Sequence, residues 1–390
     1  MSGRRRFLKQ SASVLGLGWI GIEGAGELVF GTPDRVPGTG FRGDAPSRLD
    51  AFSRPAAFFD VSGTSVTCRL CPHECVLGND DRGFCRARVV KDGSLFTVAY
   101  GNLCALNVDP IEKKPLYHFL PETSVVSIAM GGCNLRCPNC QNWEISQARP
   151  GDVKRYEVLP EQLVQLTRDR GVPCIAYTYT EPLIYYEYVR DTAARARAHG
   201  IRNVLVTAGY INEKPLRELC SVIDAVSLDV KAFTDDFYRR VSGARRGPVL
   251  RALEVLREEG VWIEVSFLMV TDLSDDPEQV GRFASWVARE LGEGTPLHVL
   301  RFHPQHKLTH LPPTPIAAMH EARRRAREAG LQFVYLGNVP GDEAGRTTCP
   351  HDGTVLVERH GYKVVSNRLK DGACPTCGRR LPGVFDVRGG

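Results

Sequence analysis

The sequence has neither an excess of charge of one sign nor a long apolar run. Lys and Arg number 50 against 45 Asp and Glu, so the net charge is only +5. Arginine-rich runs such as 323–325 fall on expected helices and are interpreted as solvated faces, so nothing demands a nucleic-acid partner. The apolar run 12–22 is too short and too glycine-rich to span a membrane as a stable helix.

A clean A-x-A cleavage site is also absent, although residues 1–30 still resemble a targeting segment. The stretch Arg4-Arg5-Arg6-Phe7-Leu8-Lys9 matches the twin-arginine pattern R-R-x-F-L-K, which marks export of folded proteins with their cofactors inserted. The alternatives are a basic N-terminus without a signal and a cytoplasmic location. Residues 31–55 are rich in Pro, Gly and Arg and are expected to form a linker.

The thirteen cysteines lack the even scatter of a disulfide scaffold. Three of them, Cys104, Cys174 and Cys220, are isolated, and we interpret these as structural. The other ten form an N-terminal set, a central set and a tail set, and their C-x2-C spacings indicate metal chemistry. The sets are, in order, Cys68, Cys71, Cys75 and Cys85; Cys133, Cys137 and Cys140; and Cys349, Cys374 and Cys377.

The central set has C-x3-C-x2-C spacing in a loop that begins Gly131-Gly132 and follows the apolar run 125–130. Three thiolates from one tight loop can hold three corners of an iron–sulfur cube. Because no fourth cysteine lies nearby, one iron would stay open to a ligand. The spacing resembles the signature of radical SAM enzymes, in which S-adenosylmethionine (SAM) chelates that iron. The alternatives are a zinc knuckle, which usually closes with four ligands, and buried free thiols.

The two outer sets lie in separate segments of the chain. The N-terminal set, within a cysteine-rich module at 56–120, can close a tetrahedral site for zinc or hold an accessory cluster, and a disulfide pair is the alternative. The tail at 341–390 resembles a zinc ribbon whose first knuckle has Asp352 in place of the second cysteine. Asp352 or His351 could complete a zinc site there, and a metal-free ribbon is the alternative.

Between the modules, residues 121–340 alternate apolar strand patterns with amphipathic helix patterns. Strands are expected at 124–129, 174–179, 203–207, 225–230, 261–269, 297–302 and 332–336. Helices are expected near 160–170, 182–199, 213–220, 248–259, 277–291 and 315–329. Repeated β/α units predict an α/β fold with parallel strands, here a partial TIM-type (β/α)6 barrel.

Polar residues stand at the carboxyl ends of the expected strands, where active residues of such barrels lie. They include a glutamate, an aspartate, a lysine and a histidine on the rim that also holds the central set. This combination suits a zwitterionic, ribose-bearing ligand. The candidates are Glu181, Thr207, Gly209, Asp229, Lys231 and His303.

Taken together, the motifs resemble the radical SAM member of the AmmeMemoRadiSam system, a relative of pyruvate formate-lyase activating enzymes. The resemblance covers roughly residues 56–385 and is most specific in the run Gln-Asn-Trp-Glu-Ile-Ser that follows Cys140. It implies a [4Fe–4S] cluster on the central set as the catalytic centre. It also implies reductive cleavage of SAM to methionine and a 5′-deoxyadenosyl radical, which abstracts hydrogen from a substrate.

The resemblance also implies roles for the rim residues. Glu181 stands where the activating enzymes contact the SAM amino group, although Tyr179 and Thr180 replace their two glycines. Thr207 and Gly209 match a Thr-Asn-Gly loop with Ala208 in the middle, and Asp229 and Lys231 match an Asp-x-Lys. His303 matches a histidine near the SAM ribose. Asn139 stands where many radical SAM proteins place an aromatic residue against adenine.

The expected function is hydrogen abstraction from an unidentified protein or small molecule. The expected partners are a low-potential electron donor such as flavodoxin or ferredoxin and other AmmeMemo proteins. A glycyl-radical enzyme activase and a non-enzymatic exported iron–sulfur or zinc electron carrier are the alternatives. The terminal cysteine modules are both expected to cover the barrel rim and keep water from a reactive radical.

Overall fold

The computed structural model describes residues 40–386 of the chain. The proposed twin-arginine segment at 1–30 and the first part of the expected linker lie outside the described residues. Within 40–386, no helix combines the length and the apolar character that a membrane span requires.

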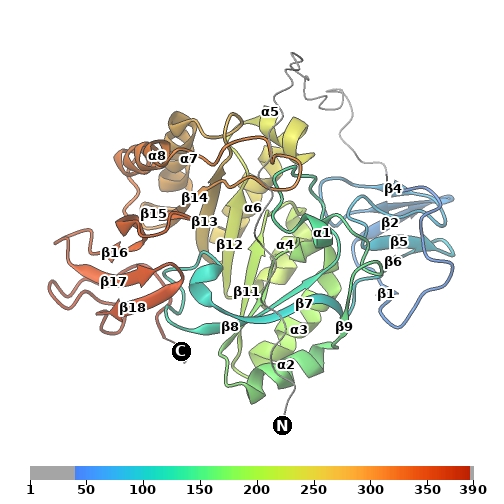
Figure 1. The fold of residues 1–390 in the computed structure, drawn as a ribbon. Helices are drawn as coiled ribbons and strands as arrows, with labels where there is room; N and C mark the ends of the chain where they lie inside the picture. Colours follow the sequence, from blue (N-terminus) through green and yellow to red (C-terminus); the bar gives the residue numbers. More distant parts are fainter. Residues whose placement is uncertain (1–39, 387–390) are drawn as a thin grey trace, which may run out of the picture. The chain divides into compact units, whose positions relative to one another are not determined.

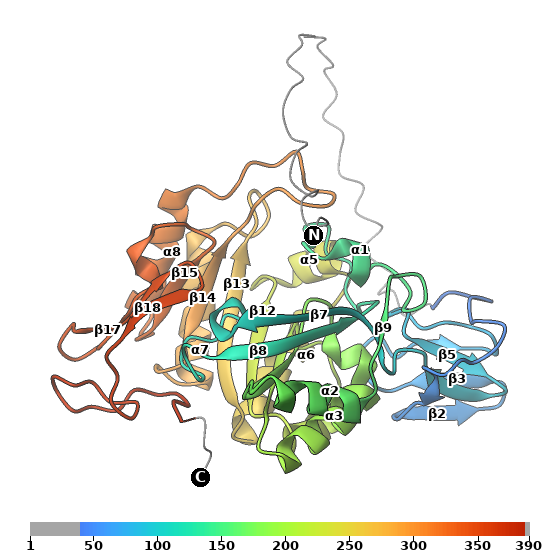
Figure 2. The ribbon, with the colours of Figure 1, turned by 60° about the horizontal axis from the view of Figure 1, so that its bottom comes forward.

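A nine-stranded sheet forms the centre of the described chain, in the order β15-β14-β13-β12-β11-β10-β8-β7-β9 (Figures 1 and 2). Seven neighbouring strands from β8 to β15 run parallel. They are β8 (Ser124–Met130), β10 (Cys174–Tyr177), β11 (Arg202–Thr207), β12 (Ala225–Val230), β13 (Trp262–Met269), β14 (Leu297–Arg301) and β15 (Val334–Gly337).

Helices connect the parallel strands, as the alternating pattern predicts. The longest of them, α7, begins where the sequence supplies a start signal: it has Pro277 in its first turn, and the Asp276 side chain accepts a hydrogen bond from the Glu278 amide at 2.9 Å. The helices are α1 (Trp143–Ser146), α2 (Pro160–Asp169), α3 (Tyr186–Ala198), α4 (Glu213–Cys220), α5 (Asp235–Phe237), α6 (Arg246–Glu258), α7 (Pro277–Glu290) and α8 (Ile316–Glu328).

Two antiparallel strands extend this sheet and were not expected from the sequence. β7 (Asn102–Pro110) pairs with β8 along its length, and β9 (Tyr156–Glu157) pairs with β7. The segment assigned to the cysteine-rich module therefore contributes a strand to the central sheet. β7 supplies the hydrogen-bond partners that β8 would lack as an edge strand.

Smaller antiparallel sheets precede and follow the central sheet. The first segment contains β1 (Arg54–Pro55), β2 (Phe59–Ser62), β3 (Ser65–Cys68), β4 (Val76–Leu77), β5 (Arg88–Lys91) and β6 (Ser94–Thr97), in two sheets of three strands. A buried ion pair between Arg88 and Glu187, 2.5 Å from Nη2 to Oε1, fastens it to α3. The tail contains β16 (Thr347–Thr348), β17 (Val355–His360) and β18 (Lys363–Asn367).

The tail packs at the amino ends of the parallel strands, and the expectation that it covers the rim is therefore wrong. His118, just before β8, is hydrogen-bonded through Nδ1 to the Pro382 carbonyl at 2.8 Å and through Nε2 to the Tyr335 hydroxyl at 2.6 Å. That hydroxyl lies 3.0 Å from Thr347 Oγ1 in β16. Glu264, near the start of β13, accepts the His118 amide at 2.7 Å. A buried polar network therefore holds the tail at the end of the sheet opposite the central set (Figure 1).

Candidate active site

The central set lies in the loop that leaves the carboxyl end of β8. Gly132 has a φ of +106°, and a Cβ atom there would stand 2.5 Å from the carbonyl oxygen of Cys85, so this position requires glycine. The Leu135 amide donates to Cys133 Sγ at 3.3 Å, and Ser146 Oγ lies 3.2 Å from Cys140 Sγ. The loop thus places its thiols beside hydrogen-bonding groups at the sheet rim.

These thiols are costly to ionise without a bound cation. Burial raises the pKa of Cys133, and the nearby Glu181 carboxylate raises it further. Burial also raises the pKa of Cys137, an effect that the positive charge of Lys231 opposes. Deprotonated thiolates in this position therefore call for a metal group to balance their charge.

The spacing of the sulfurs fits a cluster better than a single ion. Among the described residues, only the tail set with Asp352 brings three or more ligand atoms within 4.8 Å of one another. In a tetrahedral zinc site with Zn–S bonds of about 2.3 Å, the sulfurs are about 3.8 Å apart. The central set does not form such a compact group, and thiolates on separate irons of a cube are likewise spread apart.

Glu181 follows β10 and is held by the end of the next strand, β11. Its carboxylate accepts hydrogen bonds from Thr207 Oγ1 at 2.6 Å and from the Ala208 amide at 2.9 Å. The Thr207 hydroxyl in turn accepts from the Gly209 amide at 2.9 Å. Burial raises the pKa of Glu181, although these hydrogen bonds and Lys231 oppose the rise. Three of the predicted rim residues therefore form one connected group.

Asp229 and Lys231 form a second group, at the end of β12. Lys231 Nζ lies 2.5 Å from Asp229 Oδ2, whereas the other carboxylate oxygen, Oδ1, is buried without a hydrogen-bond partner. Burial lowers the pKa of Lys231, but the charges of Asp229 and Cys137 more than offset this and raise it. An unpartnered carboxylate oxygen is what a ligand hydroxyl or amino group would satisfy, so the rim fits a molecule such as SAM.

Tyr179 has a backbone conformation that glycine adopts more readily than other residues. Its φ is +64°, a left-handed conformation that costs a non-glycine residue about 1–2 kcal/mol. The Asn142 side chain donates to the Tyr179 carbonyl at 2.8 Å, and the tyrosine hydroxyl donates to Asp109. Lys114 Nζ lies 4.5 Å from the ring centre. These contacts hold a tyrosine in a glycine-like backbone geometry directly before the Glu181 segment.

His303 belongs to neither of these two hydrogen-bonded groups. Its Nε2 is 3.3 Å from the Asn338 carbonyl, and the side chain is exposed. The same loop after β14 nevertheless reaches the central set, because the Lys307 amide donates to the Pro138 carbonyl at 2.9 Å. His306 stacks on Trp143 with ring centres 4.8 Å apart. The sequence did not identify this loop contact, and only the position of Trp143 after the cysteine motif hinted at it.

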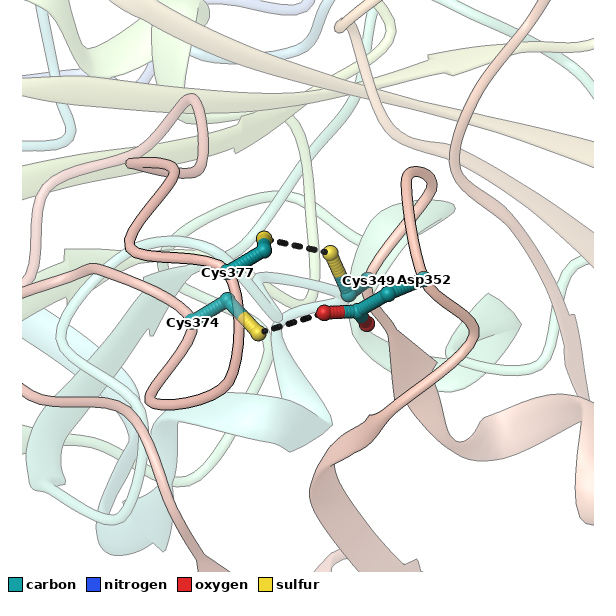
Figure 3. Close-up of side chains that lie close together, drawn as sticks. All are labelled: Cys349, Asp352, Cys374 and Cys377. Atoms are coloured by element: carbon teal, nitrogen blue, oxygen red, sulfur yellow. Dashed lines mark hydrogen bonds between the residues drawn. The ribbon is translucent and has the colours of Figure 1, made fainter.

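The tail set has a different geometry (Figure 3). Cys349 Sγ lies 3.6 Å from Cys377 Sγ, and Cys374 Sγ lies 3.5 Å from Asp352 Oδ2. Although burial raises the pKa of Cys374, backbone hydrogen bonds from Cys377 and Thr376 lower it below its ordinary value. The compact group includes Asp352 and not His351, so of the two predicted fourth ligands the structure brings the aspartate into place.

Comparisons with known proteins agree with this architecture. The Radical SAM superfamily matches residues 127–287. The uncharacterised protein MJ0808 of Methanocaldococcus jannaschii is 43% identical over 331 residues, which cover 84% of this chain and 98% of that protein. Pyruvate formate-lyase 1-activating enzyme of Escherichia coli is 24% identical over 176 residues, covering 44% of this chain and 71% of the enzyme.

A solved structure, Streptococcus suis SuiB bound to S-adenosylmethionine, aligns with a TM-score of 0.44 at 13% identity. It covers 58% of this chain and 53% of SuiB. The family assignment comes from the sequence matches, which include the strand and loop that hold the central set. The chain shares a family with MJ0808, belongs to the radical SAM superfamily and is a radical SAM enzyme.

Proposed function

We propose that this enzyme cleaves SAM reductively and uses the product radical to abstract hydrogen from a protein or small-molecule substrate. A [4Fe–4S] cluster held by Cys133, Cys137 and Cys140 would supply the electron that breaks a sulfonium C–S bond, giving methionine and a 5′-deoxyadenosyl radical. The observation that supports this most directly is the meeting of the central set with Glu181 and Lys231 at one rim of the sheet.

The rim residues bind and orient SAM in this proposal. Glu181, fixed by Thr207 and the Ala208 amide, faces the amino group, and Gly209 keeps the β11 loop close. Asp229 offers its unpartnered oxygen to a hydroxyl or amino group, while Lys231 limits the build-up of negative charge beside Cys137. His303 remains the candidate for the ribose.

The N-terminal segment and the loop after β14 exclude water from the rim. Arg136 of the cysteine loop stacks on Phe84, with Cζ 3.7 Å from the ring centre. On the other side Lys307 is bonded to the Pro138 carbonyl. Contacts from two directions leave the thiol loop little freedom, and a fixed, dry site protects a reactive radical.

The biological setting follows from the resemblance described above. We assign the enzyme to the AmmeMemoRadiSam system, with flavodoxin or ferredoxin as electron donor and the other AmmeMemo proteins as partners. The twin-arginine pattern supports export of the folded holoprotein, with the cytoplasm as the alternative. The substrate is a protein or small molecule that yields hydrogen to the deoxyadenosyl group.

The tail set supports a structural zinc site. Three thiolates and one carboxylate within 4.8 Å match the ligand types and the compactness of a closed tetrahedral site. The cysteine-rich N-terminal module and this ribbon-like tail would then flank the barrel, with only the former near the rim. A non-enzymatic electron carrier is excluded as the function, because the chain is a radical SAM enzyme.

A glycyl-radical enzyme activase is the second candidate. It is supported by the 24% identity to pyruvate formate-lyase 1-activating enzyme over 176 residues. In that case the hydrogen donor would be a backbone glycine of a partner enzyme. Electron paramagnetic resonance would show a glycyl radical on that partner after turnover, whereas the first candidate predicts another product.

The test is anaerobic incubation of the reconstituted enzyme with SAM and dithionite, with 5′-deoxyadenosine as readout. We expect product from the wild type and a loss of about 10- to 100-fold in Glu181→Ala, because a buried charge-assisted hydrogen bond contributes about 1.5–3 kcal/mol. Glu218→Ala, at an exposed glutamate on α4, is the matched control and should leave the rate unchanged. Absence of product from a wild type that holds iron would overturn the proposal.

A further inference from the structure

The N-terminal set is brought together around one cavity. Cys68 ends β3, Cys71 and Cys75 lie in the turn that leads to β4, and Cys85 lies in the loop before β5. All four line the cavity, together with Leu70, Phe84, Arg88 and Ile184 among others. The four thiols are free, so the disulfide pair weighed from the sequence does not form here.

The four sulfurs lie near one another but are not gathered as tightly as the ligand atoms of the tail set. All four line one cavity, and each is close enough to interact electrostatically with the others. Yet no three of these described sulfurs lie within 4.8 Å of one another, in contrast to the ligand atoms of the tail set. Thiolates on separate irons of a cube are spread in this way, whereas a single zinc ion draws its ligands together. Among the described residues, neither the N-terminal set nor the central set forms such a compact group.

Arg88 places a guanidinium group with an unused hydrogen-bond donor at the same cavity, which suits a negatively charged ligand. Its side chain is 1% exposed, its Nη2 pairs with Glu187, and its Nη1 lies 3.9 Å from Cys68 Sγ. Its Nε is buried without a hydrogen-bond partner, although the residue lines the cavity. The Phe84 amide also donates to Cys75 Sγ at 3.5 Å. Donors of this kind stabilise sulfur ligands and tune the potential of an iron–sulfur cluster.

We propose that Cys68, Cys71, Cys75 and Cys85 hold a second [4Fe–4S] cluster. Four protein thiolates would ligate all four irons, so this cluster would leave no open iron for SAM and would not be the site of its cleavage. The site goes beyond the proposed function, since it concerns a different set of ligands and does not depend on SAM.

The second site lies against the loop of the catalytic one. The Cys85 carbonyl fills the space beside Gly132, and His73 Nε2 donates to the Asn134 carbonyl at 2.8 Å. Asn134, inside the central loop, also lines the N-terminal cavity. The segments that carry the two thiol sets are therefore in direct contact. A cluster in the N-terminal set would hold in place the segment against which the active-site loop packs.

The test uses the full chain with Cys133→Ala, Cys137→Ala and Cys140→Ala combined, so that the central set binds no iron. After anaerobic reconstitution we expect about four irons and four sulfides per chain, with an absorbance band at roughly 400 nm. The Mössbauer spectrum should be that of a [4Fe–4S] cluster and should not change when SAM is added. Retention of zinc in excess of one equivalent with no iron, or loss of all metal from the N-terminal set, would overturn the proposal.

A complementary pair of variants tests the same site from the other side. The wild type should hold about eight irons, and Cys75→Ala combined with Cys85→Ala should hold about four, because the two remaining thiolates are too few to hold a cluster. Cys104→Ser, at a half-buried cysteine outside the three sets, should still hold eight. If that double variant fails to fold, the triple variant, whose N-terminal set is intact, decides. Lack of SAM cleavage by an eight-iron wild type would contradict the proposed function and leave the second cluster standing.

Discussion

The thiol sets near the carboxyl ends of the strands and the set in the tail differ in spacing although all contain C-x2-C motifs. Of the described residues, only the tail set with Asp352 gathers its ligand atoms within 4.8 Å. The other two sets do not form such a compact group, and the Cys85 carbonyl packs against Gly132. Motif spacing along the sequence therefore predicts metal binding, and we infer from the difference in compactness that the tail set suits a single ion and the other two sets suit clusters.

The two ends of the sheet also differ in what their polar residues do. At the carboxyl end, Asp229 leaves an oxygen unpartnered, as a ligand-binding rim should. At the amino end, both oxygens of Glu264 are taken: Oε1 by the His118 amide, and Oε2 by the Tyr117 amide and His298. Both oxygens of Glu264 are thus partnered in the network that holds the tail, whereas the free oxygen of Asp229 at the rim can accept a hydrogen bond from a ligand.

The largest expected effect comes from removing one thiol of the central set. Cys137→Ala should reduce 5′-deoxyadenosine formation to background, because two thiolates cannot hold the catalytic cluster. Zinc at the tail set should stay at one equivalent per chain, and the iron content should fall by about half. Product assay and elemental analysis on the same sample measure all three.

A matched variant sharpens that result. Cys220→Ala removes a buried cysteine that lies outside the three sets, on α4. It should retain iron, zinc and SAM cleavage. If Cys137→Ala lost the tail zinc as well, the two ends of the sheet would not be independent, and the contrast drawn above would fail.

The next effect concerns the tail. Cys374→Ala should release zinc and weaken the protection of β17 amides against hydrogen exchange. The loss would be about 4 kcal/mol if zinc is normally present at a thousand times its dissociation constant. SAM cleavage should stay within about twofold of the wild type, because the tail packs at the amino ends of the strands. A tenfold fall in cleavage would show that the tail reaches the active site.

Much of the barrel was predictable because its signals are local. The seven parallel strands and six intervening helices lie within a few residues of the expected ranges, since apolar runs and glycine stops are read along one segment. β7 was missed because its place in the central sheet depends on pairing with β8 and β9, and such partners are not visible in the segment itself. Antiparallel pairing at a sheet edge is a tertiary property.

As with the fold, some features of the candidate site were predictable from the sequence and others were not. Their positions at the ends of expected strands identified Glu181, Thr207, Asp229 and Lys231, and the resemblance added their roles. The structure joins them in two adjoining groups. The position of the tail was not predictable, because it depends on buried contacts between residues more than a hundred positions apart, such as His118 and Pro382. The distances between the sulfurs were not predictable either, since C-x2-C spacing is common to zinc sites and iron–sulfur clusters.

A smaller, pH-dependent effect tests how the tail is held. Burial lowers the pKa of His118 to about 4 from its ordinary 6.5, so the folded chain holds this ring neutral. The unfolded chain takes up the proton first as pH falls, and stability present above pH 6.5 is lost progressively towards pH 4. The loss should be about 2 kcal/mol at pH 5.

Urea unfolding at pH 7 and pH 5 measures this loss. Both the parent and His118→Gln should carry Cys374→Ala, which removes pH-dependent zinc binding from the comparison. Glutamine can donate and accept hydrogen bonds but does not titrate, so its variant should lose about 2 kcal/mol less than the parent between the two pH values. Equal losses of unfolding free energy in the two proteins would mean that folding does not lower the pKa of His118.

The smallest effect is expected from restoring the fourth cysteine of the tail. Asp352→Cys should tighten zinc binding by about tenfold, because thiolate is the softer ligand that zinc sites of this kind prefer. The gain is limited, since Asp352 Oδ1 also accepts the Thr354 amide at 2.9 Å and a thiol is a poorer acceptor. Competition with a chelator measures it. Asp352→Asn, which keeps an acceptor for Thr354 and removes the charge, should instead weaken zinc binding. Equal affinity in all three proteins would mean that residue 352 is not a ligand, and that the compact spacing of the tail set serves three thiolates alone.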